Sequence, residues 1–252
     1  PEHFFLSGLR SPHANKQVWL SASDKIISIS AASADDLYFS CPGLSAPVDI
    51  IHLSTSIHLI QPEPFLPLLH RRFWLMIGKR HAYKNGSVLL RALATLRSGG
   101  TSSGSMPLLV FVGGGPWRPA EQRWISDHQL ENAVLQVNAG DGQLAWLYRN
   151  AEAVLVPSLA EGFSLPLIEA LSCNTAVVAS DIEVHREVGG DYATFLSPLN
   201  TQAWADWFMS HSTASPLQPS EHLGVSRYVS LCDHYSLGRM TVDHIKAYQS
   251  LF

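Results

Sequence analysis

This sequence is poor in charge and in cysteine, and it lacks a long apolar run. Its 17 basic and 21 acidic residues give a net charge of −4, which provides no electrostatic reason to expect nucleic acid or anionic lipid as the main partner. No apolar stretch is long enough to span a membrane, and no charged-then-apolar leader opens the sequence. With 46% hydrophobic residues over 252 positions, we expect a compact cytoplasmic protein with one or two cores.

Signals for disulfides and metals are equally scarce. Cys41, Cys173 and Cys232 are odd in number and widely spaced, which favours reduced thiols over a disulfide framework. None of the 12 histidines forms a zinc-ligand pattern with another histidine or a cysteine. No Asp-x-Asp pair is present to hold a divalent cation. We therefore expect no metal and no cofactor.

Strand-like and helix-like segments alternate along the chain. Several strand candidates are nearly continuous apolar runs, as expected of parallel strands buried on both faces. The alternation predicts an α/β fold with a doubly wound parallel sheet from about Arg72 to His211. The expected strands are 25–30, 48–53, 72–77, 108–112, 133–137, 153–157, 176–180 and 194–196. The expected helices are 85–97, 120–128, 143–150, 166–172, 182–188 and 202–211.

Two linkers divide the chain into three parts. Residues 61–67 are proline-rich and should be extended, and residues 212–220 are polar with two prolines. We expect a partial α/β domain over residues 1–66, a complete sheet domain over 67–211 and a helical tail over 212–252. The low-complexity segment 97–105 follows a helix rather than a strand, so we interpret it as a surface loop and not as a phosphate loop.

The most informative motif is Glu161-Gly-Phe-Ser-Leu-Pro-Leu-Ile-Glu169, which follows the expected strand 153–157. Pro166 suits the first turn of a helix, where its missing N–H is not needed. The loop before it presents backbone N–H groups at a helix N-terminus, which favours an anion. The two carboxylates can accept hydrogen bonds from hydroxyl groups. A nucleotide-sugar is a ligand that needs both kinds of contact, because it carries phosphate and hydroxyl groups.

Other polar motifs follow other expected strands. The basic segment 78–85 follows strand 72–77, the triplet 113–115 of glycines follows strand 108–112, and residues 138–141 follow strand 133–137. Ligands of doubly wound sheets lie outside the carboxyl ends of the strands, so we expect these motifs at one edge. Taken alone, each has a simpler alternative, namely an exposed basic turn, a tight glycine turn and an Asx-type turn.

Together these motifs resemble those of the family 4 glycosyltransferases, which are retaining enzymes of the GT-B fold. The E-x7-E run carries the resemblance, and residues 144–151, 187–191 and 235–237 support it in order and rough spacing. The similarity is good over about residues 72–252 and looser over 1–60, and it is closest to mannosyltransferases of polysaccharide assembly. Pro1-Glu2 would match the middle of the family's N-terminal domain, so we expect a fragment that binds the donor weakly and catalyses poorly or not at all.

The resemblance implies transfer of a hexose, with mannose favoured, from a nucleotide-diphosphate sugar to a saccharide or lipid-linked acceptor with retention. It also implies a peripheral membrane contact through the N-terminal domain. It places Glu169 on the ribose and Glu161 near the donor hexose. Arg80 and Lys84, with Lys79 as the alternative to Arg80, would neutralise the departing diphosphate. The further donor contacts are assigned to Gly162, Phe163, Ser164, Leu165, Gly113, Gly114 and Asn138.

Several positions and two other function classes stay open. Ser164 stands where the family usually has glycine, and Glu187 matches a recurrent family glutamate or is a helix-surface or capping residue. We expect His81 and His185 to be surface or half-buried residues. Trp204, Trp207 and Phe208 recur at helical spacing, which favours packing. The alternatives to a transferase are a non-catalytic nucleotide-sugar binding module and a GT-B epimerase or phosphorylase.

Overall fold

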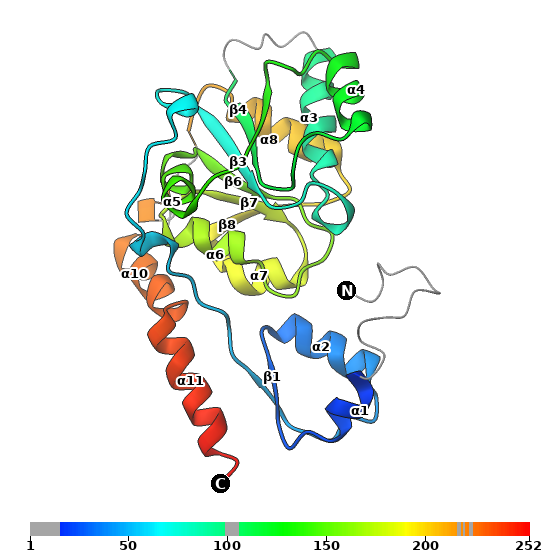
Figure 1. Ribbon diagram of the computed structural model, residues 1–252, viewed down its shortest axis with the longest axis vertical. Helices are drawn as coiled ribbons and strands as arrows, with labels where there is room; N and C mark the ends of the chain where they lie inside the picture. Colours follow the sequence, from blue (N-terminus) through cyan, green and yellow to red (C-terminus); the bar gives the residue numbers. More distant parts are fainter. Residues whose placement is uncertain (1–15, 99–105, 216–217, 219, 222–223) are drawn as a thin grey trace.

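The computed structural model describes residues 16–98, 106–215, 218, 220–221 and 224–252 (Figure 1). Its main body is a six-stranded sheet with the strand order β5-β4-β3-β6-β7-β8, in which every neighbouring pair is parallel. The doubly wound parallel sheet expected from the sequence is thereby confirmed. The strands are β3 (Phe73–Ile77), β4 (Leu108–Val112), β5 (Val134–Val137), β6 (Ala153–Val156), β7 (Val177–Ser180) and β8 (Ala193–Leu196).

The sheet is buried on both faces because its strands are apolar at successive positions. In β3, Phe73 and Leu75 join the core cluster on one face, while Trp74 and Met76 join the cluster on the other. Successive side chains of a strand point to opposite faces, so a continuous apolar run supplies both cores. One face is covered by α5 (Asp141–Asn150), α6 (Leu165–Ser172) and α7 (Glu183–Gly189), and the other by α3 (Ser87–Ser98), α4 (Pro119–Asp127) and α8 (Thr201–Ser210) (Figure 1).

The aromatic residues of α8 pack into the second core, as expected. Trp204 and Phe208 are fully buried, and Trp207 is buried as well. The rings of Trp74 and Phe208 stack with their centroids 4.6 Å apart. This helix therefore closes one side of the sheet and takes no part in ligand stacking.

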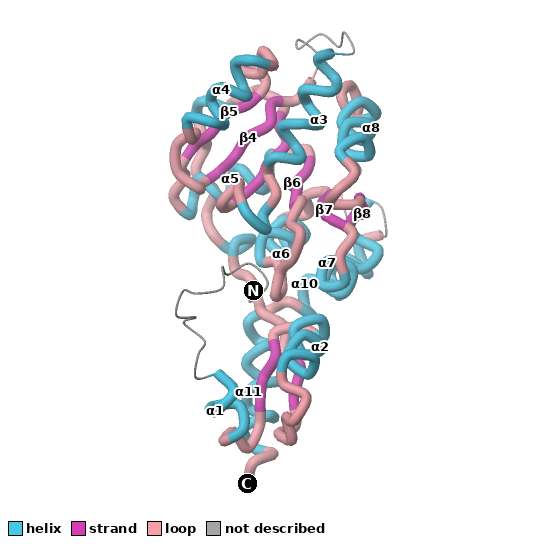
Figure 2. The backbone as a smooth tube through the Cα atoms, turned by 90° about the vertical axis from the view of Figure 1, so that its right-hand side faces the viewer, coloured by secondary structure: helices cyan, strands magenta, loops and turns pink. Residues whose placement is uncertain are grey.

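A smaller unit lies at the other end of the molecule (Figure 2). Its two parallel strands are β1 (Ile26–Ser28) and β2 (Val48–Ile50), and its helices are α1 (Lys16–Ser21) and α2 (Ala31–Ser40). The helix α2 was not among those expected from the sequence. The signal for it is Ser30, whose side chain accepts a hydrogen bond from the backbone N–H of Ser33 and so caps the helix.

The connecting segments complete the chain. The short 3-10 turn η2 (Ile57–Leu59) precedes the proline-rich linker, and η3 (Leu66–Leu68) overlaps its end. The helical tail contains α10 (Val225–His234) and α11 (Leu237–Gln249). Lys25 Nζ donates to Ser250 Oγ at 2.5 Å, which places the end of α11 beside β1. Most of the predicted loop 97–105 lies outside the described residues. No helix in the described ranges is long and apolar enough to cross a bilayer.

Candidate functional site

The candidate site lies where the strand order of the sheet reverses. β3 and β6 are neighbours at the centre, but the chain first runs outward through β4 and β5 and returns to β6 afterwards. The basic segment 78–85 leaves the carboxyl end of β3, and the Glu161–Glu169 motif leaves the carboxyl end of β6. Ligands of doubly wound sheets bind in the crevice at such a reversal. The two predicted motifs therefore share the position at which this architecture binds ligands.

Arg80 is buried in the protein rather than free to meet a phosphate. Its guanidinium side chain is 2% exposed, bonds both oxygens of Glu121 at 3.1 and 3.2 Å and lies over the Trp117 ring. Its remaining N–H groups donate to the backbone carbonyls of residues 113, 115 and 116. All five donors of a guanidinium are thus occupied. Arg80 therefore supports the glycine turn in this structure, its role as a phosphate-binding cation stays a prediction, and its alternative Lys79 is exposed.

The glycine triplet is a tight turn that packs against the basic segment. Gly113, Gly114 and Gly115 have backbone φ values of 78°, 72° and 74°, which residues other than glycine rarely adopt. A Cβ on Gly114 would lie 2.9 Å from the carbonyl oxygen of Gly78. The turn thus holds the Gly78–Arg80 backbone in place, and its contact with a nucleotide stays a prediction.

Lys84 and Glu161 come together across the strand reversal. Lys84 Nζ donates to Glu161 Oε1 at 2.6 Å, and the hydroxyl of Ser158 donates to the same oxygen at 2.7 Å. The Glu161 side chain is 9% exposed, so this ion pair is largely shielded from water. The turn η4 (Ala82–Lys84) is followed by Asn85 in the left-handed conformation, which directs the chain into α3.

Glu169 is partly buried on α6 and has one side-chain partner. The hydroxyl of Tyr148, which is fully buried on α5, donates to Glu169 Oε2. Burial raises the pKa of Glu169, and the hydrogen bond from Tyr148 opposes that rise. The other oxygen, Oε1, has no hydrogen-bond partner within the described residues and can accept from a ligand.

The loop between the glutamates leaves backbone donors unpaired. The N–H groups of Gly162, Phe163, Ser164 and Leu165 have no hydrogen-bond partner in the described part of the chain. The ring of Phe163 is buried and packs against His52 and Tyr235, so this residue offers a ligand its backbone only. Such donors at the start of α6 can bind phosphate, as the sequence predicts.

Ser164 adopts a conformation that favours glycine. Its φ is +94°, and its buried hydroxyl has no hydrogen-bond partner within the described ranges. Both features oppose serine at this position. We expect Ser164→Gly to raise the free energy of unfolding by about 1 kcal/mol in urea denaturation. Ser164→Ala is the control, since it removes the hydroxyl but keeps the Cβ; equal stability of the two variants would show that the backbone is not strained.

His185 is fully buried beside the ion pair, contrary to the expectation of a surface or half-buried residue. Its Nδ1 bonds the carbonyl oxygen of Ser180 at 2.9 Å, so Nδ1 carries the proton. The buried Nε2 has no hydrogen-bond partner in the part of the chain that the structure describes. Burial lowers its pKa from the ordinary 6.5, with Glu161 acting against this and Lys84 in favour of it. The imidazole is therefore a neutral group within the electrostatic reach of Lys84 and Glu161.

This burial predicts a contribution to acid sensitivity. Because the pKa of His185 is lower in the folded chain than in the unfolded one, the unfolded chain binds the proton first as pH falls below about 6.5. The free energy of unfolding should decrease over that window. We expect His185→Gln to have a shallower decrease than the parent chain in urea denaturation between pH 7 and 5. Equal slopes would contradict a neutral buried imidazole.

Glu187 caps a helix of the smaller unit. Its carboxylate accepts from the backbone N–H groups of Ala31 at 2.7 Å and Ala32 at 3.1 Å, in the first turn of α2. His52 Nε2 bonds the same carboxylate at 2.8 Å. Burial raises the pKa of Glu187, but the bonds from Ala31, His52 and Ala32 outweigh it and leave the pKa lowered. The capping alternative therefore describes this residue, which joins the smaller unit to the sheet domain.

The hydroxyl groups of the smaller unit also reach the glutamate loop. Ser30 Oγ and Ser33 Oγ donate to the carbonyl oxygen of Gly162 at 2.7 and 2.8 Å. By contrast, Asn138 is exposed after β5, and among the described residues its side chain bonds only that of Gln136, at 3.5 Å. The structure brings Lys84 and Glu161 together, places Glu169 on the following helix, and leaves Asn138 and Lys79 without contact to either.

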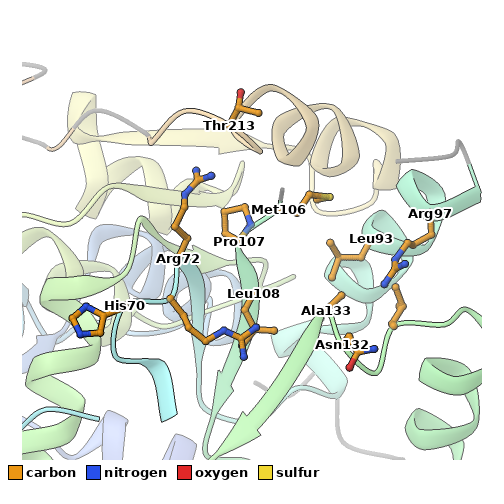
Figure 3. Close-up of a pocket in the computed structure, with 12 residues that line it drawn as sticks. His70, Arg72, Leu93, Arg97, Met106, Pro107, Leu108, Asn132, Ala133 and Thr213 are labelled. Atoms are coloured by element: carbon orange, nitrogen blue, oxygen red, sulfur yellow. The ribbon is translucent and has the colours of Figure 1, made fainter. Parts of the chain in front are cut away.

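A hollow of about 580 Å³ lies at the opposite edge of the sheet (Figure 3). Its lining comes from the segments at the amino ends of β3, β4 and β5, from the last turns of α3 and from Thr213 after α8, and it includes Arg71, Leu108, Asn132 and Arg97. None of the residues predicted for the donor site lines it. Within the described ranges, no group of three or more His, Cys, Asp or Glu side chains is placed to hold a metal ion.

Sequence reasoning missed Tyr148 and Ser158. Tyr148 lay inside the matching segment 144–151, but no local pattern links it to Glu169, which is 21 positions away. Ser158 could have been found from its place directly after the strand and three residues before Glu161. A polar residue at the end of a buried strand is a recurring signal for a site.

Comparison with known proteins identifies relatives of the sheet domain. The family model of glycosyl transferases group 1 matches residues 64–210. The O-antigen chain mannosyltransferase RfbU of Salmonella typhimurium is 33% identical over 103 residues, which are 40% of this chain and 29% of that protein. D-inositol 3-phosphate glycosyltransferase 1 of Catenulispora acidiphila is 27% identical over 186 residues, or 67% of this chain and 44% of that protein. The chain thus spans less than half the length of these curated relatives.

A solved structure shares the fold. HepE of Anabaena, crystallised in complex with UDP-glucose, superposes with a TM-score of 0.72 at 17% identity. The superposition covers 99% of this chain and 69% of HepE. The match therefore includes the smaller unit as well as the sheet domain.

Proposed function

Because this chain belongs to the glycosyl transferases group 1 family, we propose that it forms the donor side of a retaining hexosyltransferase that uses a nucleotide-diphosphate sugar. The observation that carries the proposal is the placement of Lys84 and Glu161 as a pair at the strand reversal, with Glu169 on the helix that follows. Basic and acidic groups at one crevice suit a ligand that carries both phosphates and sugar hydroxyls.

Each side chain has a distinct part in the proposed reaction. Glu169 accepts hydrogen bonds from the ribose hydroxyls, and Glu161 accepts one from the donor hexose. When the bond between the hexose and the diphosphate breaks, negative charge builds on the departing phosphate. Lys84 and Lys79, together with the free N–H groups of residues 162–165, stabilise that charge.

We further propose that the hexose is mannose or a close neutral relative and that the acceptor is a saccharide or a lipid-linked saccharide in the cytoplasm. The name of RfbU as a mannosyltransferase supports the sugar, and the UDP-glucose complex of HepE supports a nucleotide-diphosphate hexose as donor. The length shared with the curated relatives supports a donor-binding part of a larger activity.

The reaction class is tested by product analysis in three arms. Nucleotide-hexoses are incubated with the chain alone, with inorganic phosphate, or with a saccharide acceptor, and the products are identified by NMR. We expect no new sugar in the first two arms, and any transfer in the third to keep the anomeric configuration of the donor. An epimerised sugar in the first arm or a hexose 1-phosphate in the second would overturn the transferase assignment.

A further inference from the structure

The two oxygens of the Glu161 carboxylate have different surroundings. Oε1 accepts both the Lys84 ammonium at 2.6 Å and the Ser158 hydroxyl at 2.7 Å. Oε2 has no hydrogen-bond partner within the described residues. It is also not one of the fully buried polar atoms, so a ligand can reach it. Oε1 is therefore held by the protein, while Oε2 is the oxygen that can accept a hydrogen bond from a ligand.

Ser158 is held rigidly at this position. Its residue is 1% exposed, and both neighbours are bonded to the turn that carries Lys84. Asn85 Nδ2 donates to the carbonyl oxygen of Pro157 at 3.0 Å, and the N–H of Leu159 donates to the carbonyl oxygen of Tyr83 at 2.6 Å. Neither of these bonds involves the Lys84 side chain, so the backbone on both sides of Ser158 is held independently of that side chain.

We propose that Ser158 is a positioning residue that holds the Glu161 carboxylate toward the donor hexose when Lys84 turns to the diphosphate. This inference rests on the proposed function, in which Lys84 serves the departing phosphate. A lysine that moves to the phosphate leaves Oε1 with one donor, the Ser158 hydroxyl. This donor is uncharged, so it fixes the orientation of the carboxylate without neutralising it, and Oε2 remains a strong acceptor for a sugar hydroxyl.

The test separates the sugar from the nucleotide. The parent chain and Ser158→Ala are titrated calorimetrically with UDP and UDP-glucose, and with GDP and GDP-mannose. The affinity ratio between the nucleotide-sugar and its nucleoside diphosphate measures the contribution of the hexose. We expect Ser158→Ala to lower this ratio by about tenfold, the effect of losing one hydrogen bond to a charged group, while the affinity for the nucleoside diphosphate is unchanged.

Two further variants complete the design. Ser158→Thr restores a hydroxyl and should restore the ratio. Ser180→Ala is the matched control, because Ser180 is also fully buried at the end of a neighbouring strand, but its hydroxyl has no hydrogen-bond partner among the described residues. It should leave the ratio as in the parent chain. A purely structural role of Ser158 would weaken both ligands equally and would leave the ratio unchanged.

The outcomes distinguish this inference from the proposed function. Binding of both ligands with the same ratio in Ser158→Ala as in the parent would overturn the positioning role and leave the donor site intact. Equal affinity of the parent for the sugar-bearing and sugar-free nucleotide would also overturn it. A folded parent chain that binds neither ligand would remove the proposed donor site and this inference with it.

Discussion

Replacing Arg80 by alanine should lower the free energy of unfolding by about 3–5 kcal/mol, the range found when one partner of a buried ion pair is removed. The substitution removes both guanidinium bonds to the Glu121 carboxylate and the bonds to the backbone carbonyls of residues 113, 115 and 116. It also removes the guanidinium from the face of Trp117. The change is measured by urea or guanidinium denaturation.

The control for Arg80 is another arginine of the same region. Arg123 lies on α4 and bonds a backbone carbonyl at the exposed surface, so Arg123→Ala should change stability by less than about 0.5 kcal/mol. Arg80→Lys should recover little of the lost free energy of unfolding, because an ammonium group cannot reproduce the planar guanidinium that bonds both Glu121 and the glycine turn. A stable Arg80→Ala variant that has lost nucleotide binding would support the phosphate-binding role expected from the sequence.

Replacing Glu169 by alanine should weaken nucleotide binding by about a hundredfold or more, since each hydrogen bond to a charged group contributes about 1.5–3 kcal/mol and two are proposed to the ribose. The raised pKa of Glu169, caused by burial, adds a pH signature. Affinity should begin to fall on acidification at a higher pH than the ordinary 4.5 of a glutamate, because the protonated carboxyl accepts hydrogen bonds less well. Calorimetric titration at several pH values measures both effects.

Two further variants are compared with Glu169→Ala. Glu183→Ala removes an exposed glutamate of α7 and should leave nucleotide affinity unchanged. Tyr148→Phe keeps the carboxylate but removes the hydroxyl that orients it, so it should weaken binding less than Glu169→Ala does. Parental affinity in Glu169→Ala would contradict the ribose assignment.

The sheet could be predicted because its strands are local apolar runs. The stretches that became β3, β4, β6 and β7 are buried on both faces, and the helices between them are long enough to show their own period. The ends of β4 are as expected, and other strand ends differ by one to a few residues, as is usual where apolar character continues past the last ladder bond. The site followed from the same pattern, since its motifs stand directly after strands.

The direction in which a side chain points could not be predicted from the sequence. The adjacent Lys79 and Arg80 are both basic, and only the folded glycine turn decides that Arg80 points inward. Glu187 bonds residues 156 and 155 positions away, so no local pattern could identify its partner helix. His185 is buried by packing that involves the ends of neighbouring elements, and nothing in its immediate sequence indicates this.

In the proposed function, a nucleoside diphosphate binds where β3 and β6 end. Calorimetric titration of the unmodified chain with a panel of nucleoside diphosphates and nucleotide-sugars tests it most directly, with cooperative unfolding as proof that the chain is folded. We expect saturable binding of one nucleotide at a single site. A chain that unfolds cooperatively and binds no member of the panel would contradict it.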